Sequence, residues 1–254
     1  MKITLIQPDI RWENIEWNLS NLYDLINKSD SDIILLPELF TTGFTMKSER
    51  FAEVLNGSSH QWMKDVANEF DMAISGSLII RDGKNYFNRL LFVEPSGETS
   101  FYDKRHLFRM GEEDKNYSPG KKRLTKEFRN CKVSPLICYD LRFPVWSRNT
   151  EAYDLLCYHA NWPASRDSVW KSLLIARAIE NQCFVAGINR VGSDGEGVDY
   201  KGNSLLIDPR GEIMLNLGNE ENVATVELDL NSLEEFRKKF PVWKDADKFS
   251  IDGL

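Results

Sequence analysis

A carboxylate, an amine and a thiol each come directly after a short apolar run in this sequence. These residues are Glu38, Lys104 and Cys138, and His159 and Asn161 follow a fourth apolar run in the same way. In open α/β proteins, side chains just beyond the carboxyl ends of strands gather in one pocket. If the apolar runs are strands, these reactive groups are therefore expected to meet.

Together, Glu38, Lys104 and Cys138 have the chemistry of acyl transfer. A thiol becomes a nucleophile when a neighbouring base or cation favours its thiolate. A glutamate can accept the thiol proton and return it to a leaving amine, and a lysine can stabilise the oxyanion that forms at an attacked carbonyl. In isolation each residue has a simpler interpretation, as an inert buried cysteine, a surface carboxylate or a solvated basic edge. The hypothesis therefore depends on the combination.

Two other classes of protein remain open at this point. Cys138 could instead pair with His159 in a Cys–His hydrolase, although a histidine after an apolar strand is also expected as a hydrogen-bonded core residue. A catalytically silent scaffold on the same fold is the third class. Loss of turnover in His159→Ala, with Glu38→Ala tolerated, would favour the Cys–His class. Failure of iodoacetamide to label Cys138 selectively would favour the scaffold.

The elements that must position these groups alternate between helical and strand patterns. Mixed alternation of this kind predicts an α/β protein with a mixed sheet or two stacked sheets. Ser58 or Ser59 is expected to cap the second helix. The predicted helices span 15–26, about 58–70 and about 165–181, and the predicted strands span 3–6, 33–37, 74–80, 86–93, 99–103, 133–137, 155–158, 183–188, 204–207 and 224–228.

The composition predicts one globular domain over 1–254, with a polar C-terminal tail from about 240. Hydrophobic residues make up 42% and charged residues 28% of the 254 residues, which is ordinary for a folded protein. No shift in composition and no linker-like segment divides the chain. The formal charge is −7, with no basic run to follow a phosphate backbone, so no nucleic-acid partner is expected.

The sequence also bears on location and cofactors. No apolar run reaches the roughly 20 residues of a membrane span, and the N-terminal run is too short for a signal peptide, so no membrane partner is expected. The four cysteines include no CxxC pair and there are only three histidines, so no metal site is expected. Without an export signal, the cysteines are expected to be reduced thiols in the cytoplasm.

Five stretches of the sequence, in the same order along the chain, resemble motifs of the nitrilase (carbon–nitrogen hydrolase) superfamily. The resemblance implies a four-layer αββα sandwich, a homodimer or larger homo-oligomer, a small-molecule amide substrate and no cofactor. The motifs together cover nearly the whole chain, which makes the match specific. They are LPELFTTGF at 36–44, YDKRHLF at 102–108, ICYDLRFP at 137–144, YHANWP at 158–163 and RAIENQ at 177–182.

The same resemblance implies roles for individual residues. Glu38 is the general base, Lys104 the stabiliser of the transition state, and Cys138 the thiolate that forms a thioester. The backbone N–H of Tyr139 would share the oxyanion with the Lys104 ammonium. These roles agree with the acyl-transfer chemistry expected from the residue types.

The resemblance also concerns residues around this triad. A second glutamate stands between the Lys and Cys motifs in many members, and Glu113 is favoured here, with Glu112 as the alternative. Arg142, Arg177 and Glu180 are expected to hold the turn at the cysteine and its neighbouring helix. Arg177 and Glu180 lie three apart, as an ordinary ion pair on one helix would.

The segment that follows Cys138 is most similar to the bacterial omega-amidases, which implies hydrolysis of 2-oxoglutaramate or 2-oxosuccinamate. Such a substrate needs aromatic walls, for which Phe44, Trp146 and Trp162 are candidates, and a cation for its carboxylate, for which Arg109 is a candidate. An N-carbamoyl amino acid amidohydrolase, or another aliphatic amidase of the superfamily, remains the alternative. A true nitrilase is less favoured because the similarity at branch level is to enzymes that act on amides.

Overall fold

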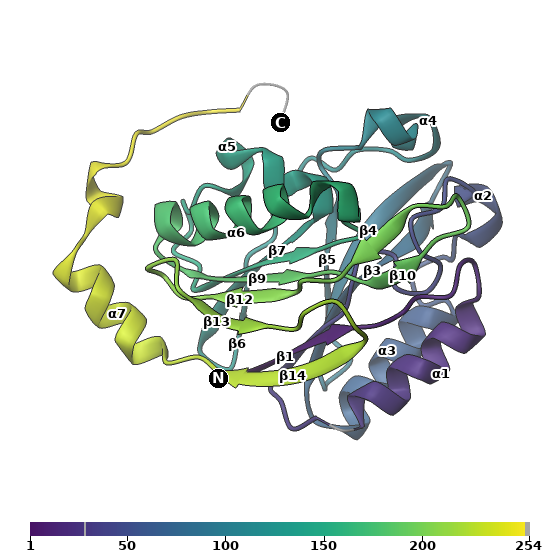
Figure 1. Ribbon diagram of the computed structural model, residues 1–254, viewed down its shortest axis with the longest axis horizontal. Helices are drawn as coiled ribbons and strands as arrows, with labels where there is room; N and C mark the ends of the chain where they lie inside the picture. Colours follow the sequence, from purple (N-terminus) through teal and green to yellow (C-terminus); the bar gives the residue numbers. More distant parts are fainter. Residues whose placement is uncertain (28, 252–254) are drawn as a thin grey trace.

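Two twisted sheets, packed face to face, form the centre of the molecule (Figure 1). The structure is a computed structural model, and it describes residues 1–27 and 29–251. Within these residues each of the two large sheets has six strands. The first sheet has the order β14 (Asn222–Glu227), β1 (Lys2–Gln7), β2 (Ile33–Leu35), β3 (Ala73–Asp82), β4 (Asn85–Val93) and β5 (Thr99–Asp103). The second has the order β13 (Ile213–Asn216), β12 (Leu205–Ile207), β9 (Phe184–Ile188), β8 (Leu155–His159), β7 (Cys131–Ile137) and β6 (Lys126–Phe128).

The faces that the two sheets turn toward each other share one apolar core. Ile3, Leu35 and Phe92 of the first sheet belong to the same buried cluster as Val133 and Ala186 of the second. Successive side chains of a strand point to opposite faces, so every second residue of these strands contributes to this core. The remaining apolar residues face outward and require a covering layer.

Helices supply that layer on both sides, as Figure 1 shows. Buried residues of α1 (Ile15–Ile26) and α3 (Ser58–Glu69) pack with Ile34 and Ile74 of the first sheet. Buried residues of α6 (Asp167–Asn181) and α5 (Pro144–Ser147) cluster with apolar residues of the second sheet. The order helix, sheet, sheet, helix confirms the predicted αββα sandwich.

Smaller elements complete the fold and show where the sequence-based boundaries differ. Helix α6 begins at Asp167, because a separate 3₁₀ turn, η3 (Ala164–Arg166), precedes it. The predicted serine cap of α3 is wrong: Gly57 is its N-cap, and the Ser59 hydroxyl instead bonds to Glu53. The other short elements are α2 (Ser48–Phe51), α4 (Glu113–Asn116), α7 (Leu230–Lys239), η1 (Arg109–Gly111), η2 (Cys138–Arg142), η4 (Val242–Asp245) and the hairpin β10 (Val191–Ser193) and β11 (Asp199–Lys201).

Strand direction brings the ends of several strands to one edge of the sandwich. β2 is parallel to β3, and β5 runs the same way because both β3 and β5 are antiparallel to β4. β7, β8 and β9 are mutually parallel in the second sheet. None of the helices in the described residues is long and apolar enough to cross a membrane.

Candidate active site

Glu38 lies buried just beyond β2, where it accepts hydrogen bonds on both carboxylate oxygens. Its Oε1 accepts from Lys104 Nζ at 2.7 Å and from Asn88 Nδ2 at 2.8 Å, and its Oε2 accepts from the backbone N–H of Asn161 at 2.9 Å. The next residue, Leu39, has a φ of +45°, which marks a sharp turn immediately after the carboxylate. Glu38 is therefore held by groups from β4, from the end of β5 and from the loop after β8.

Lys104 directly follows β5 and is only 1% exposed. Its backbone N–H bonds to the carbonyl of Asn88, and its own carbonyl accepts from Gly120. A Cβ at Gly120 would lie 2.0 Å from the carbonyl oxygen of Asp103, so only glycine permits this close approach. Close packing of the two chain segments therefore fixes the backbone from which the ammonium extends.

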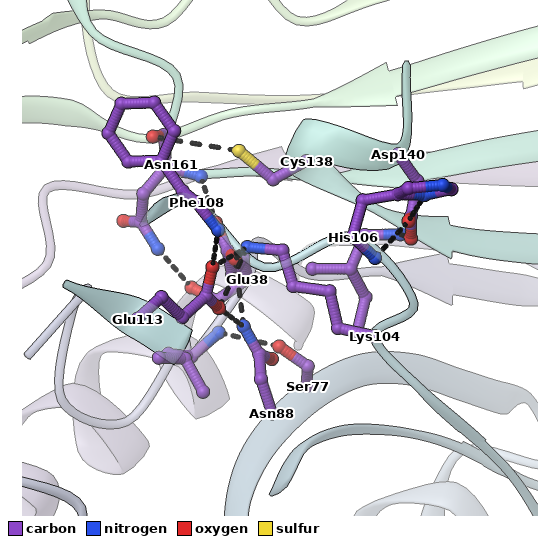
Figure 2. A network of polar contacts seen from close by, with 12 residues as sticks. Glu38, Ser77, Asn88, Lys104, His106, Phe108, Glu113, Cys138, Asp140 and Asn161 are labelled. Atoms are coloured by element: carbon purple, nitrogen blue, oxygen red, sulfur yellow. Dashed lines mark hydrogen bonds and ion pairs between the residues drawn. The ribbon is translucent and has the colours of Figure 1, made fainter. Parts of the chain in front are cut away.

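Glu113 completes a buried cluster of three charged side chains, in which Lys104 lies between Glu38 and Glu113 (Figure 2). Both of its oxygens lie 2.9 Å from Lys104 Nζ, and its Oε2 accepts from the N–H of Phe108 at 2.6 Å. Glu112 adopts the left-handed region, with φ +59°, and its exposed carboxylate pairs with Lys115 instead. Of the two glutamates left open by the sequence, the structure places Glu113 against Lys104 and Glu112 at the surface of the same loop.

Burial and charge act in opposite directions on this cluster. Burial alone would lower the pKa of Lys104, but attraction to Glu113 and Glu38 outweighs it and raises that pKa well above its usual value. Burial raises the pKa of Glu113, and the charge of Lys104 offsets this only in part. The ammonium is therefore fully protonated, while the two carboxylates share a single cation.

Cys138 occupies a strained turn at the end of β7. Its φ is +42°, a conformation rarely adopted by residues other than glycine, asparagine or aspartate. Asp140 stabilises this turn, because its carboxylate accepts hydrogen bonds from the N–H of Ile137 at 3.1 Å and from the hydroxyl of Tyr102 at 2.7 Å. Arg177 holds it from α6, by donating to the carbonyl of Leu141 at 2.7 Å. We call this segment, 137–142, the cysteine elbow.

The thiol of Cys138 is neutral in this environment. Burial is the main cause that raises its pKa well above the usual value, and the negative charge of Glu38 raises it further, while Lys104 lowers it in part. The sulfur lies 3.9 Å from the carbonyl oxygen of Asn161, whose N–H contacts Glu38. A base must therefore remove the proton before the sulfur can attack, and the Glu38 carboxylate lies beside it.

His159 does not take part in this arrangement. Its Nδ1 bonds to the carbonyl of Leu36 at 2.6 Å and its Nε2 to the hydroxyl of Ser75 at 3.1 Å, so both ring nitrogens are occupied. Burial lowers the pKa of His159 to about 4. The ring tethers β8 to the first sheet, and the geometry gives no support to the Cys–His alternative.

A cavity of about 840 Å³ opens onto the thiol and connects it to solvent. Lys104, Cys138 and Asn161 are among the residues that line it. The aromatic residues that line it are Trp12, Phe44, Phe108, Tyr139, Trp162 and Tyr200, and the cationic residues besides Lys104 are Lys47, Arg142 and Arg166. Lys47 is already paired with Glu13, whereas neither arginine forms an ion pair with any residue that the structure describes.

Two residues expected to contact substrate lie elsewhere, and both expectations are corrected. Trp146 is buried beneath the cysteine elbow, where its indole N–H donates to the hydroxyl of Tyr102 at 2.9 Å. The helix α5 turns this side chain toward the core and away from the cavity. Arg109 is 86% exposed and lies 3.8 Å from Asp114, because it stands on the outer side of η1.

Two kinds of residue in the site were not predicted. Asn88 contacts both glutamates from within β4, and its polar side chain on the inward face beside Leu90 and Phe92 was the available signal. Arg142 was expected only to support the elbow, yet it also lines the cavity together with Arg166. Among residues 1–27 and 29–251, no three His, Cys, Asp or Glu side chains cluster as metal ligands would.

Comparison with known proteins agrees with this geometry. The family model described as carbon–nitrogen hydrolase matches residues 2–238. Omega-amidase YafV of Escherichia coli is 45% identical, over 99% of this chain and 98% of its own length. The 2-oxoglutaramate amidase of Bacillus subtilis is 36% identical, over 97% of each chain.

A solved structure is also closely similar. It is XC1258 from Xanthomonas campestris, described as a CN-hydrolase superfamily protein with an arsenic adduct in the active site. The two share 40% identity and a TM-score of 0.97, over 99% of this chain and 98% of the other. The superfamily inferred from the five motifs, the omega-amidase branch of its relatives and the sandwich fold are thereby confirmed. This chain belongs to the carbon–nitrogen hydrolase family.

Proposed function

We propose that this enzyme is an omega-amidase, which hydrolyses the terminal amide of 2-oxoglutaramate or 2-oxosuccinamate to the dicarboxylate and ammonia. The observation that carries the proposal is the buried Glu38–Lys104–Glu113 cluster beside the Cys138 thiol. Lys104 and Cys138 line a cavity that is also lined by two arginines with no ion pair among the described residues. The cluster suits attack on an amide carbonyl, and the arginines suit a substrate with a carboxylate. Two relatives support it by name: one is called an omega-amidase and the other a 2-oxoglutaramate amidase.

The first half of the proposed reaction transfers the acyl group to the enzyme. Glu38 takes the thiol proton of Cys138 as the sulfur attacks the amide carbon, and a C–S bond forms. The oxyanion is stabilised by the Lys104 ammonium and by the backbone N–H of Tyr139. When the intermediate collapses, the C–N bond breaks and Glu38 gives its proton to the leaving nitrogen, which departs as ammonia.

The second half releases the acid. A water molecule gives a proton to Glu38 and attacks the thioester carbon, through a second oxyanion at the same position. The C–S bond then breaks and Glu38 returns the proton to the thiolate of Cys138. The carboxylic acid leaves and gives its own proton to the released ammonia, so the products are the carboxylate and ammonium. Glu113 contacts Lys104 throughout and keeps the ammonium oriented.

For substrate recognition, we propose Arg142 as the partner of the substrate carboxylate. It stands four residues after Cys138 on the same elbow, and its guanidinium lies 5.2 Å from the ring centroid of Trp162, which holds it over the cavity wall. A planar guanidinium can bind a carboxylate through two parallel hydrogen bonds. Phe44 and Trp162 would then enclose the carbon chain between Arg142 and the thiol.

An ammonia-release screen across 2-oxo acid ω-amides, N-carbamoyl amino acids, simple aliphatic amides and nitriles tests the proposal. The highest kcat/KM is expected for 2-oxoglutaramate or 2-oxosuccinamate, with no release from Cys138→Ala. Mass spectrometry should detect an acyl adduct on Cys138 in Glu113→Gln. A clear preference for N-carbamoyl amino acids or plain amides would replace this function with the alternative amidase, since the same catalytic cluster serves them.

We further propose a homodimer that forms through the face of α5 and α6. Val145 and Ile179 on these helices are more than half exposed, as are Phe240 and Trp243 of the C-terminal segment. Clusters of exposed apolar residues mark interaction surfaces. Light scattering should give the mass of two chains, and Val145→Lys with Ile179→Lys should give one; a wild-type monomer at micromolar concentration would contradict this proposal.

We propose that the enzyme works in the cytoplasm. All four cysteines are free and buried, an arrangement that suits a reducing compartment. Fractionation of the native host with an antibody against the chain tests this location, and recovery in an exported fraction would contradict it.

A further inference from the structure

Asn88 joins the two buried glutamates by a second bridge, besides that of Lys104 (Figure 2). Its Nδ2 donates to Oε1 of Glu38 at 2.8 Å and to Oε1 of Glu113 at 3.3 Å. Lys104 Nζ contacts the same two oxygens, at 2.7 and 2.9 Å. The four side chains therefore form a closed ring in which each carboxylate lies between one ammonium and one amide.

The chemistry of the neighbours fixes the orientation of this amide. An ionised carboxylate only accepts hydrogen bonds, so the NH₂ end of Asn88 must face Glu38 and Glu113. The opposite end, Oδ1, is buried without a partner among the described residues. Proteins rarely leave a buried carbonyl unpaired, and such exceptions tend to have a functional cause. Here the cause is that both N–H groups are directed at the carboxylates.

Because Asn88 is buried, its side chain cannot contact a substrate in the cavity. Asn88 is fully buried in β4 and does not line the cavity. Its backbone carbonyl accepts from the N–H of Lys104 at 3.0 Å, so the residue holds the lysine backbone as well as the two carboxylates. Any effect of Asn88 on the reaction must pass through Glu38, Lys104 and Glu113.

We propose that Asn88 is a positioning residue for Glu38 and Glu113. It keeps the two carboxylates apart and hydrogen-bonded in their present orientation while Lys104 donates one N–H to the oxyanion. Two carboxylates and one cation leave the ring with a net negative charge, so the carboxylates repel each other. The neutral amide satisfies one oxygen of each without adding charge. All three N–H groups of Lys104 already contact carboxylate oxygens, so one of these contacts must loosen when the ammonium turns to the oxyanion, and Asn88 then still holds both Oε1 atoms.

The substitution Asn88→Asp distinguishes a role in hydrogen bonding and charge from a role in packing. It keeps the shape of the side chain but places a third acid in a ring with one cation. The titratable groups near it are Glu38 and Glu113, Lys104, the Cys138 thiol, and Tyr117 at the end of α4. Added negative charge disfavours every deprotonation among these groups, so the acid limb of the pH–rate profile must move to higher pH.

The control is Asn181→Ala. Asn181 is also a buried asparagine with two side-chain hydrogen bonds, to the carbonyl of Arg177 at 3.1 Å and from the N–H of Asn149 at 2.9 Å. It lies on α6, outside the ring, so its loss costs stability without touching the carboxylates. Thermal melting of all variants allows comparison at temperatures where each is folded.

Three measurements test the proposal, which rests on the catalytic roles assigned under the proposed function. In ammonia release, Asn88→Ala should lower kcat about 10- to 100-fold with KM within about twofold, and Asn181→Ala should match the wild type. Asn88→Asp should move the acid limb of kcat/KM upward by about one pH unit or more. The pH midpoint of Cys138 alkylation by iodoacetamide should rise in the same variant.

Superimposable pH profiles for Asn88→Asp and the wild type, in turnover and in alkylation, would overturn the proposal. So would a kcat for Asn88→Ala within twofold of the wild type. Should the wild type release no ammonia from any amide, the proposed function fails while alkylation still tests Asn88. If Asn88→Ala does not fold, the isosteric Asn88→Asp still gives both profiles.

Discussion

Removing the negative charge of Glu38 should have opposite effects on two reactions of the same thiol. In Glu38→Gln, amide hydrolysis loses its proposed general base, whereas the Cys138 thiol loses the charge that, after burial, most raises its pKa. Burial still raises that pKa, but Lys104 now acts without an opposing carboxylate beside the sulfur. The thiol should therefore ionise at lower pH in the variant that cannot turn over substrate.

The size of both effects can be worked from the site. Glu38 accepts from the Asn161 N–H at 2.9 Å, and the sulfur lies 3.9 Å from the carbonyl of the same residue, so carboxylate and thiol are near neighbours. Two unit charges about 5 Å apart at an effective dielectric of about 20 interact by about 3 kcal/mol, which is large enough to lower the pH midpoint of alkylation measurably. Loss of general acid–base catalysis costs about 10²- to 10⁴-fold in rate.

The assay is alkylation of Cys138 by iodoacetamide across a pH series, read by intact mass, beside ammonia release on the same preparations. Cys138→Ala gives the background from the other cysteines, which are buried. Glu112→Gln is the matched control, since it removes an exposed carboxylate from the same cavity and should leave the midpoint unchanged. An alkylation midpoint in Glu38→Gln equal to or above that of the wild type would refute the electrostatic argument.

Four further outcomes are expected. Arg142→Ala should raise KM for 2-oxoglutaramate about 10- to 100-fold with little change in kcat, whereas Arg109→Ala should leave both within about twofold; equal effects would remove Arg142 from recognition. Glu113→Gln should lower kcat about 100-fold in ammonia release, and retention of wild-type kcat would show that Lys104 needs no second carboxylate. Trp146→Phe should lower the free energy of unfolding by about 1 kcal/mol in urea titration and leave KM unchanged. A raised KM would show that Trp146 contributes to substrate binding. Dialysis against a chelator should leave turnover intact, and loss that added metal restores would contradict a mechanism by protein groups alone.

The positions of the reactive residues could be predicted because they obey a rule of strand direction. Glu38, Lys104 and Cys138 follow β2, β5 and β7, and parallel or equivalently directed strands end at the same edge. Asn88 was not predicted because it does not follow the end of a strand. It lies near the start of β4, which is antiparallel to its neighbours, so its beginning lies at the edge where the others end. A search restricted to residues after strands cannot find it.

The walls of the cavity were harder to predict than the cluster of Glu38, Lys104 and Cys138. Trp146 and Trp162 both follow reactive residues, yet only Trp162 lines the cavity. Which way such a side chain turns depends on short elements, here α5 and η3, whose geometry is set by contacts distant in sequence. Arg109 and Arg142 show the same limit, since a cation near a motif can face either solvent or substrate.

The hydrogen-bond arrangement around Lys104 limits how the oxyanion can be stabilised. The ammonium has three N–H groups and three carboxylate contacts, one with Glu38 and two with Glu113. An N–H for the oxyanion must therefore come from one of these contacts. Glu113 can release one most easily, because it makes two of the three contacts and would keep the other, whereas Glu38 makes only one. Under the proposed mechanism, Glu113 would keep Lys104 charged and oriented before attack, and would give up one contact as charge develops on the substrate oxygen.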